Sequence, residues 1–244
     1  MPNVGRSGLD VIGPNGEYIF VGGGAKARDR SKFGRALQTA EYAAELLAMA
    51  DGFIQWYRED LTTADFAEQA EIFSEFGIKL IHPNKNAALV LDIEGDDVPM
   101  SQEELGSLIG RRFATLTFHW WLTADSNVID TYEAVPVGRE TQTLWLDGLH
   151  PDEVQRVESA VMAAATRLPA PTRAVIVDRR GISDPDDWDS IALWDGTHVP
   201  AAPDHVLALD PIAERIRRAA PGLRKEDTGG GRLSRLVPLR DPAA

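Results

Sequence analysis

The sequence predicts an α/β domain over residues 1–86, followed by an α+β domain with an antiparallel meander over residues 87–244. Three observations support this division. Residues 1–86 alternate strand-like and helix-like patterns in the order β-β-α-β-α-β. From residue 113 onward, three strand-like runs follow one another without an intervening helix. The charge also changes, since the first part carries 9 basic and 12 acidic side chains and the second carries 16 and 26.

The first domain begins with a hairpin over residues 9–21, because Asn15-Gly16 between two apolar runs is the strongest short signal for a tight turn. Its remaining elements follow from caps and apolar periodicity. We expect a helix over 31–50, a strand over 52–57, a helix from Thr62 or Thr63 to Gly77 and a strand over 78–81. The domain boundary falls at 83–87, with the alternative that a strand over 88–93 still belongs to the first sheet.

The second domain contains a strand over 113–123 in which apolar and polar residues alternate. Trp120 and Trp121 then lie on opposite faces, so one of them needs a cover from a helix or a partner. His119 shares the polar face with Trp121, where a structural or interface role is favoured. Further predicted elements are strands over 128–135, 142–146, 174–177 and 191–194, and helices from Ser101, over 151–168 and from Asp210.

The composition excludes several function classes. The chain has no cysteine, which removes disulfides, thiol nucleophiles and cysteine-based zinc sites. A formal net charge of −13 argues against broad non-specific binding to nucleic acid, because affinity for phosphates depends on Lys and Arg. No stretch resembles a signal peptide or a membrane span, so we expect a cytoplasmic protein.

The candidate site residues lie in the first domain. Asp10 stands on the first hairpin strand, Glu17 begins the second, and Lys26 follows a Gly-Gly-Gly sequence. Gln38 and Tyr42 are four residues apart on the next predicted helix and therefore share one face. An acid, a hairpin, a lysine and then Gln-x-x-x-Tyr is an order found in metal-dependent nuclease sites.

This order resembles the QxxxY branch of the PD-(D/E)XK nucleases and the C-terminal toxin domains of bacterial polymorphic and contact-dependent toxins. The resemblance covers residues 8–83, and its motifs are Asp10–Gly16, Val21–Lys26 and Ser31–Gln38. It implies a restriction-endonuclease-like fold that hydrolyses phosphodiester bonds of DNA or RNA, tRNA included, with Mg²⁺ or Mn²⁺. In that reading Asp10 and Glu17 hold the metal, Lys26 polarises the water and the phosphate, and Gln38 with Tyr42 orients the site.

One departure from the family pattern leaves the activity open. The family has acid-x-Lys on the second strand, whereas Glu17 precedes Lys26 by nine residues, too far on a straight strand. Either a glycine bend returns Lys26 to the site, or Glu41 or Glu45 supplies the second acid, or the site is metal-free or inactive. Taken alone, Asp10 is equally typical of a turn-capping residue.

The acidic second domain suggests a protein partner. The segment Asp184–Asp189 is a candidate calcium loop, a solvated acidic loop, or an acidic and aromatic cover for a basic nuclease site. We therefore expect a polymorphic-toxin-related nuclease domain joined to an inhibitory, immunity-like or protein-binding domain. The alternative is a non-enzymatic immunity or binding protein that retains a nuclease-like fold, and a third reading is one continuous α/β domain.

Overall fold

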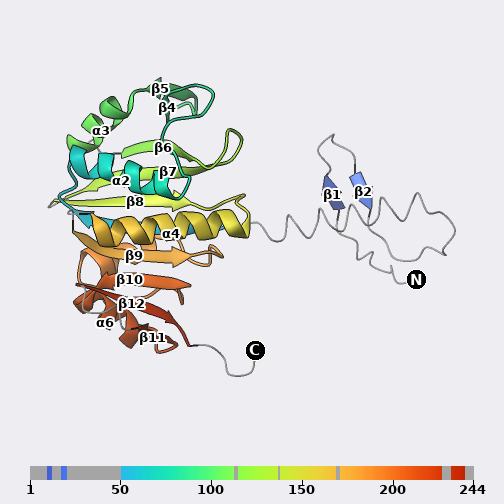
Figure 1. Cartoon of the computed structure of the whole chain (residues 1–244). Coiled ribbons are helices and arrows are strands. Elements are labelled where there is room, and N and C mark those ends of the chain that lie inside the picture. Colours follow the sequence, from blue (N-terminus) through green and yellow to red (C-terminus); the bar gives the residue numbers. More distant parts are fainter. Residues whose placement is uncertain are drawn as a thin grey trace, which may run out of the picture. The chain divides into compact units, whose positions relative to one another are not determined.

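The structure is a computed structural model, and it describes residues 10–12, 18–20, 51–112, 115–136, 138–168, 171–226 and 232–239 (Figure 1). The chain divides into two units, Met1–Leu47 and Ala48–Ala244. In the first unit, β1 (Asp10–Ile12) pairs antiparallel with β2 (Tyr18–Phe20). This pairing confirms the predicted hairpin around Asn15-Gly16. The predicted helix over 31–50 lies outside the described residues.

The described part of the second unit is built on one antiparallel sheet of ten strands. Their order across the sheet is β11-β12-β10-β9-β3-β8-β7-β6-β4-β5. The strands are β3 (Phe53–Glu59), β4 (Ala88–Leu91), β5 (Asp97–Met100), β6 (Thr115–Trp121), β7 (Asn127–Val135), β8 (Arg139–Trp145), β9 (Thr172–Asp178), β10 (His205–Leu209), β11 (Leu223–Glu226) and β12 (Leu233–Pro238). The helices are α2 (Thr63–Glu75), α3 (Gln102–Gly110), α4 (Pro151–Arg167), the 3-10 helix η1 (Pro185–Trp188), α5 (Asp189–Leu193) and α6 (Asp210–Ala219).

The sheet continues across the domain boundary predicted at residues 83–87. β3 pairs with β8 on one side and with β9 on the other, so it is a central strand of the large sheet. Its first six residues are buried, as expected for a strand covered on both faces. The strand and the helix α2 therefore belong with residues 88–239, and a separate restriction-endonuclease-like domain over 1–86 is not confirmed.

Helix starts follow local sequence closely. Thr62 and Ser101 each form a capping box with the acid three residues later. This confirms the box predicted for Ser101 and the cap predicted at Thr62 or Thr63. Gly77 has a φ of +74° directly after α2, a backbone conformation that favours glycine. The predicted meander is also present, since β6, β7 and β8 are consecutive antiparallel neighbours.

Two predicted strands were wrong. Residues 191–194 lie mostly in α5, where Ile191 and Leu193 are buried against the sheet. A short apolar run fits a buried strand and a buried helix equally well, and here the helix forms. The predicted strand over 78–81 contributes a single antiparallel bridge between Lys79 and Trp121.

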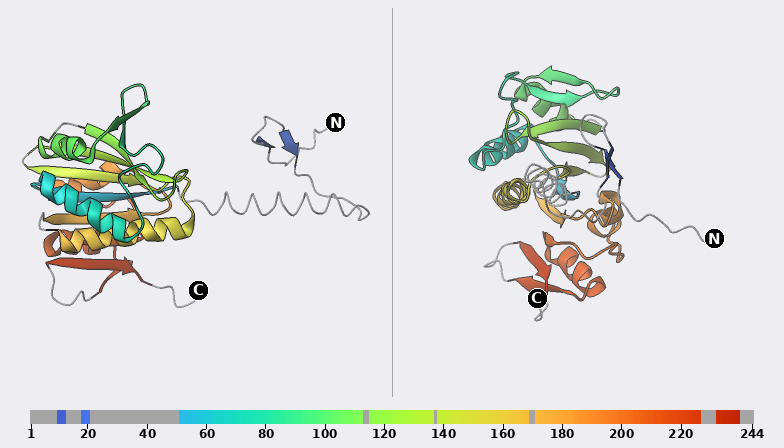
Figure 2. Two further views of the ribbon diagram at one scale, coloured as in Figure 1. Left: turned by 45° about the horizontal axis from the view of Figure 1, so that its top comes forward. Right: turned by 90° about the vertical axis from the view of Figure 1, so that its right-hand side faces the viewer.

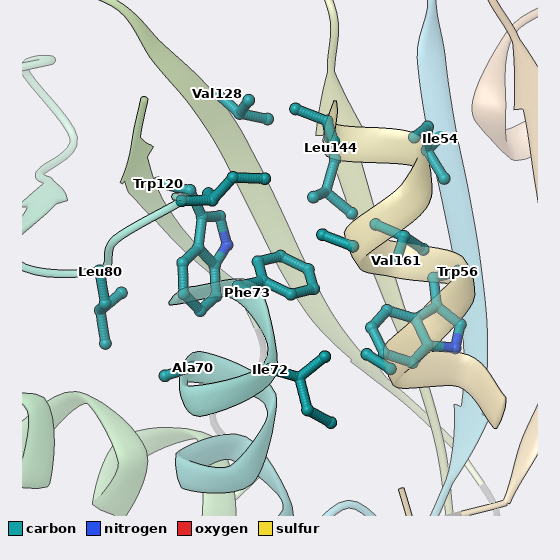
Figure 3. Packing of buried hydrophobic residues seen from close by; sticks show 14 of the residues in the cluster. Ile54, Trp56, Ala70, Ile72, Phe73, Leu80, Trp120, Val128, Leu144 and Val161 are labelled. Carbon is teal, nitrogen blue, oxygen red and sulfur yellow. The ribbon is translucent and has the colours of Figure 1, made fainter. Parts of the chain in front are cut away.

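The main core lies between one face of the sheet and helices α2, α3 and α4. Figure 3 shows Phe73 of α2 beside Trp120 of β6, and their ring centroids are 4.6 Å apart. Trp56 of β3 and Val161 of α4 extend this core toward the middle of the sheet. The even-numbered side of β6 is thus the core side, as its alternation predicted.

A second core covers the other face of the sheet over fewer strands. Trp188, Ile191 and Ile216 of η1, α5 and α6 pack against residues of β3, β9, β10 and β12. In the right-hand view of Figure 2, α2 and α4 (cyan and yellow) lie on one side of the sheet, and the orange-brown helices lie on the other side. The sheet is therefore sandwiched between helices only toward its C-terminal strands.

Candidate functional site

The candidate site lies where the sheet carries helices on one face only. Along β7, the even-numbered residues 128–132 are buried toward the main core, whereas Ile129 and Glu133 on the opposite side are exposed. Trp145 of β8 is directly opposite Ile129 in the strand register and shares its face. We call the group of side chains on this side the open sheet face: Ile129, Thr131, Glu133 and Trp145.

A pocket of about 940 Å³ adjoins one end of the open sheet face. Ile129 and Trp145 form its apolar part. The polar part comes from the turn between β6 and β7, at residues 123–127, and from the connection between β8 and α4, at residues 147–153. The pocket thus combines an aromatic wall with backbone-rich polar loops, a composition common in binding sites.

Glu153 fixes these two loops to each other. Its side chain is buried and accepts a hydrogen bond from Ser126 Oγ at 2.8 Å and one from the backbone N–H of His150 at 3.0 Å. The second bond is part of the capping box that begins α4. A carboxylate at this helix position is also favoured by the helix dipole. The pocket therefore has a rigid polar frame.

The rim of the pocket carries carboxylates without a counter-charge. Burial raises the pKa of Asp147, and the adjacent Asp51 carboxylate raises it further. Asp125 projects from the opposite loop and also lines the pocket. Within the described ranges, no Lys or Arg side chain forms an ion pair with these three acids. The rim is therefore a region of negative potential beside an aromatic wall.

A second acidic group borders the other end of the open sheet face. Tyr57 Oη donates a hydrogen bond to Asp189 Oδ1 at 2.9 Å. The pKa of Asp189 is raised to about 6, mainly by burial. The hydrogen bond from Tyr57 lowers this pKa, whereas the nearby carboxylates of Asp186 and Glu133 raise it further. The pKa of Tyr57 is raised above its ordinary value by burial and by Asp189. Both ends of the open sheet face are therefore acidic.

The acidic segment 184–189 differs from the exposed acidic and aromatic loop considered from sequence. It forms η1 and the start of α5, and the Asp187 carboxylate accepts a hydrogen bond from the backbone N–H of Asp184. Trp188 is fully buried, and its indole N–H donates to Ser183 Oγ at 3.0 Å. Among the described residues, no group of three or more metal-ligating side chains is arranged to hold a metal ion. Asp184, Asp186 and Asp187 are exposed, whereas Asp189 is half-buried beside Tyr57.

His119 and Trp121 form a small aromatic cluster on the polar face of β6. Trp121 is covered by the ring of His82, whose centroid lies 4.3 Å away, so its cover is the segment after α2. His119 Nδ1 lies 3.0 Å from Asn127 Oδ1, and Nε2 lies 3.3 Å from the Asp97 carboxylate. These contacts agree with a structural role at the edge of the open sheet face.

The structure places one of the sequence-predicted nuclease residues. Asp10 is in β1, opposite Phe20 of β2. Glu17, Lys26, Gln38 and Tyr42 lie outside the described residues. The residues that make the pocket were not predicted from sequence.

Comparison with known proteins identified no match: no protein-family model, no curated protein and no solved structure is similar to this chain. No described helix is long and apolar enough to cross a membrane. The site is therefore interpreted from its own chemistry. The large unit holds 33 acidic and 19 basic side chains over residues 48–244, so the negative potential of the site agrees with that of the unit as a whole.

Proposed function

We propose that residues 51–239 form a protein-binding domain of the inhibitory, immunity-like type, whose open sheet face docks on a basic surface of a nuclease. The observation that carries this proposal is the open sheet face itself. The apolar pair Ile129 and Trp145 lies between the acids at Asp147 and those at Glu133 and Asp189. An aromatic anchor within a polar rim is the usual composition of an energetic centre in a protein interface.

The charge of the surface selects the class of partner. Nucleic acid is disfavoured, because phosphates are attracted by Lys and Arg and repelled by carboxylates. A basic protein surface is favoured for the opposite reason, and long-range attraction between opposite charges also accelerates its association. Nucleases carry basic surfaces to hold their substrates, so an acidic face that covers such a surface competes directly with the substrate.

A second candidate function concerns the first unit. The pairing of β1 with β2, which carry Asp10 and its neighbours, supports the proposal that the first unit, Met1–Leu47, retains a metal-dependent nuclease site. Asp10 and Glu17 are its proposed metal ligands for Mg²⁺ or Mn²⁺, with Lys26, Gln38 and Tyr42 around them. In this case the acidic domain is the intramolecular inhibitor of the nuclease, and DNA or RNA is the substrate.

One experiment tests the inhibitory function. Purified full-length protein is mixed with a panel of purified bacterial toxin nuclease domains, and both complex formation and cleavage of tRNA and plasmid DNA are measured. We expect at least one nuclease to be bound and inhibited by the wild type and not by Ile129→Arg. A folded wild-type protein that neither binds nor inhibits any member of the panel would overturn the proposal.

The nuclease candidate has its own test. The full-length chain is incubated with tRNA, single-stranded RNA and plasmid DNA in Mg²⁺, in Mn²⁺ and in chelator. Cleavage that disappears in Asp10→Ala and in Lys26→Ala supports a nuclease site in the first unit. Equal cleavage by the wild type and both variants excludes it.

A further inference from the structure

The pocket beside Trp145 shows a specific chemical preference. Three of its features are independent of one another: it has a volume of about 940 Å³, an apolar wall from the exposed Ile129 and the half-buried Trp145, and carboxylates of Asp125 and Asp147 in its lining. The volume is large enough for a long side chain. Trp145 offers an indole face, the aromatic surface that attracts cations most strongly.

The rim acids have no intramolecular partner to neutralise them. Some other carboxylates of the sheet do have cationic partners, as Glu59 does with Arg173 and Asp97 with Lys85 at 2.9 Å. Asp147 instead lies beside a second carboxylate, that of Asp51. Two adjacent acids repel each other, and a cation between them removes that repulsion.

The polar frame of the pocket is already organised. Glu153 has both carboxylate oxygens engaged, one with Ser126 Oγ and the other with the backbone N–H of His150. The loops that carry Asp125 and Asp147 are therefore held in place before any ligand arrives, which reduces the entropic cost of binding.

We infer that this pocket receives one cationic side chain, arginine or lysine, from the protein that docks on the open sheet face. The aliphatic part of that side chain packs on Ile129 and the face of Trp145, and its charged end lies between Asp125 and Asp147. The inference rests on the proposed function for the identity of the partner, but the preference of the pocket for a cation stands on the pocket residues alone.

Capped single amino acids test this preference without any partner protein. N-acetyl-arginine methylamide and N-acetyl-lysine methylamide are titrated into ¹⁵N-labelled full-length protein, and the indole N–H resonance of Trp145 is followed. The matched neutral probe is N-acetyl-citrulline methylamide, which has nearly the shape of the arginine compound without its charge. We expect saturable shifts with the cationic probes, with a dissociation constant on the order of 1 mM for ligands of this size.

Two variants locate the effect. Asp147→Asn and Asp125→Asn should each weaken binding of the arginine probe by at least about fivefold, in line with the loss of one charge-assisted contact. Glu103→Gln removes the same charge from the exposed side of α3 and should leave binding unchanged. Citrulline that binds as well as arginine, absence of a saturable shift with both cations, or equal binding by all variants would overturn the inference. Because these probes need no nuclease, failure here is distinct from failure of the inhibitory function.

Discussion

Ile129 and Trp145 are direct cross-strand partners on β7 and β8, and both lie on the side of the sheet that α2, α3 and α4 do not cover. The indole of Trp145 also contacts the ring of Phe53 edge to face, with centroids 6.3 Å apart. This contact ties Trp145 to the second core, whereas Ile129 remains 36% exposed. The pair thus forms an apolar patch in which Trp145 packs against the second core and Ile129 is accessible to a partner.

Ile129→Arg tests whether this patch binds a partner. We expect complex formation with a bound nuclease to weaken by at least about 100-fold, because arginine adds a charge and volume at the centre of the contact. The free energy of unfolding should change by no more than about 1 kcal/mol, since Ile129 is partly exposed and lies outside both cores. Titration calorimetry and urea denaturation give the two values.

Ile93→Arg is the control for that substitution. Ile93 is 97% exposed in the connection between β4 and β5, away from the open sheet face. Its replacement introduces the same charge and the same side chain. Binding that falls equally in both variants would show that the added charge, and not the patch, is responsible.

The pair of Tyr57 and Asp189 predicts a pH dependence of stability. The pKa of Asp189 is about 6 in the folded protein and close to 3.8 when unfolded, so between these values the folded state binds more protons. The contribution of Asp189 to the free energy of unfolding is therefore greatest below about pH 4, and it is lost as the pH rises through 6. Asp189→Asn keeps an oxygen acceptor for Tyr57 Oη and removes the charge.

We expect Asp189→Asn to raise the free energy of unfolding at pH 7.5 by about 1 kcal/mol, a value reduced for the partial exposure of the side chain. Near pH 4 the variant and the wild type should be equally stable. Urea denaturation at both pH values measures this. A stabilisation of the same size at pH 4 would contradict the titration of Asp189 as its cause.

The sequence predicts those elements that short-range interactions decide. The capping boxes at Thr62 and Ser101 involve side chains three residues apart, and both helices start where these boxes predict. The meander of β6, β7 and β8 is likewise local, because consecutive strands pair through short turns. Alternation within β6 also identifies Trp120 as the core residue and Trp121 as the residue on the other face.

Long-range pairing is what the sequence does not reveal. β3 lies next to β8 and β9, whose paired residues are eighty or more positions away along the chain, and a separate first domain was predicted for lack of that information. The pocket has the same origin, since Asp51 and Asp147 meet only after β3 enters the sheet. The pocket also depends on η1, α5 and α6 covering only part of the second face of the sheet. No local sequence pattern encodes how far that covering extends.

Glu158 of α4 provides a prediction about stability. Its buried carboxylate binds Arg179 and also contacts His205 of β10, so that it ties the helix to the sheet. Burial alone would raise its pKa, but the hydrogen bonds from His205 and Arg179 outweigh burial and lower it. The contribution of Glu158 is therefore present above its unfolded pKa of 4.5 and is lost as the pH falls.

Glu158→Gln should cost about 1 kcal/mol at pH 7, because it leaves Arg179 without its partner while the partly exposed guanidinium remains solvated. The difference from the wild type should shrink below pH 4. Chemical denaturation across this range provides the measurement, with Glu103→Gln as an exposed acid that should change stability little. A difference that does not depend on pH would assign the loss to packing of the side chain.

The buried pair of Arg58 and Asp130 gives the last prediction. Arg58 is fully buried in the main core, where its guanidinium stacks on Trp56 at 4.1 Å and donates to Gln69 Oε1 at 2.9 Å. Burial lowers the pKa of Arg58 to about 10, and the Asp130 carboxylate opposes that change. Asp130 in turn accepts a hydrogen bond from Trp120 Nε1 at 2.8 Å.

Removing both charges of this pair should destabilise the protein by less than the sum of the two single losses. We expect Asp130→Asn and Arg58→Met each to cost about 3 kcal/mol, because each removes an opposite charge that compensates the burial of the other group. The double variant should lose less than the sum by at least about 2 kcal/mol, which urea denaturation of all four proteins in a double-mutant cycle will show. Additive losses would mean that Arg58 and Asp130 are stabilised separately, by Gln69 and Trp120, and that the charge of one does not support the other.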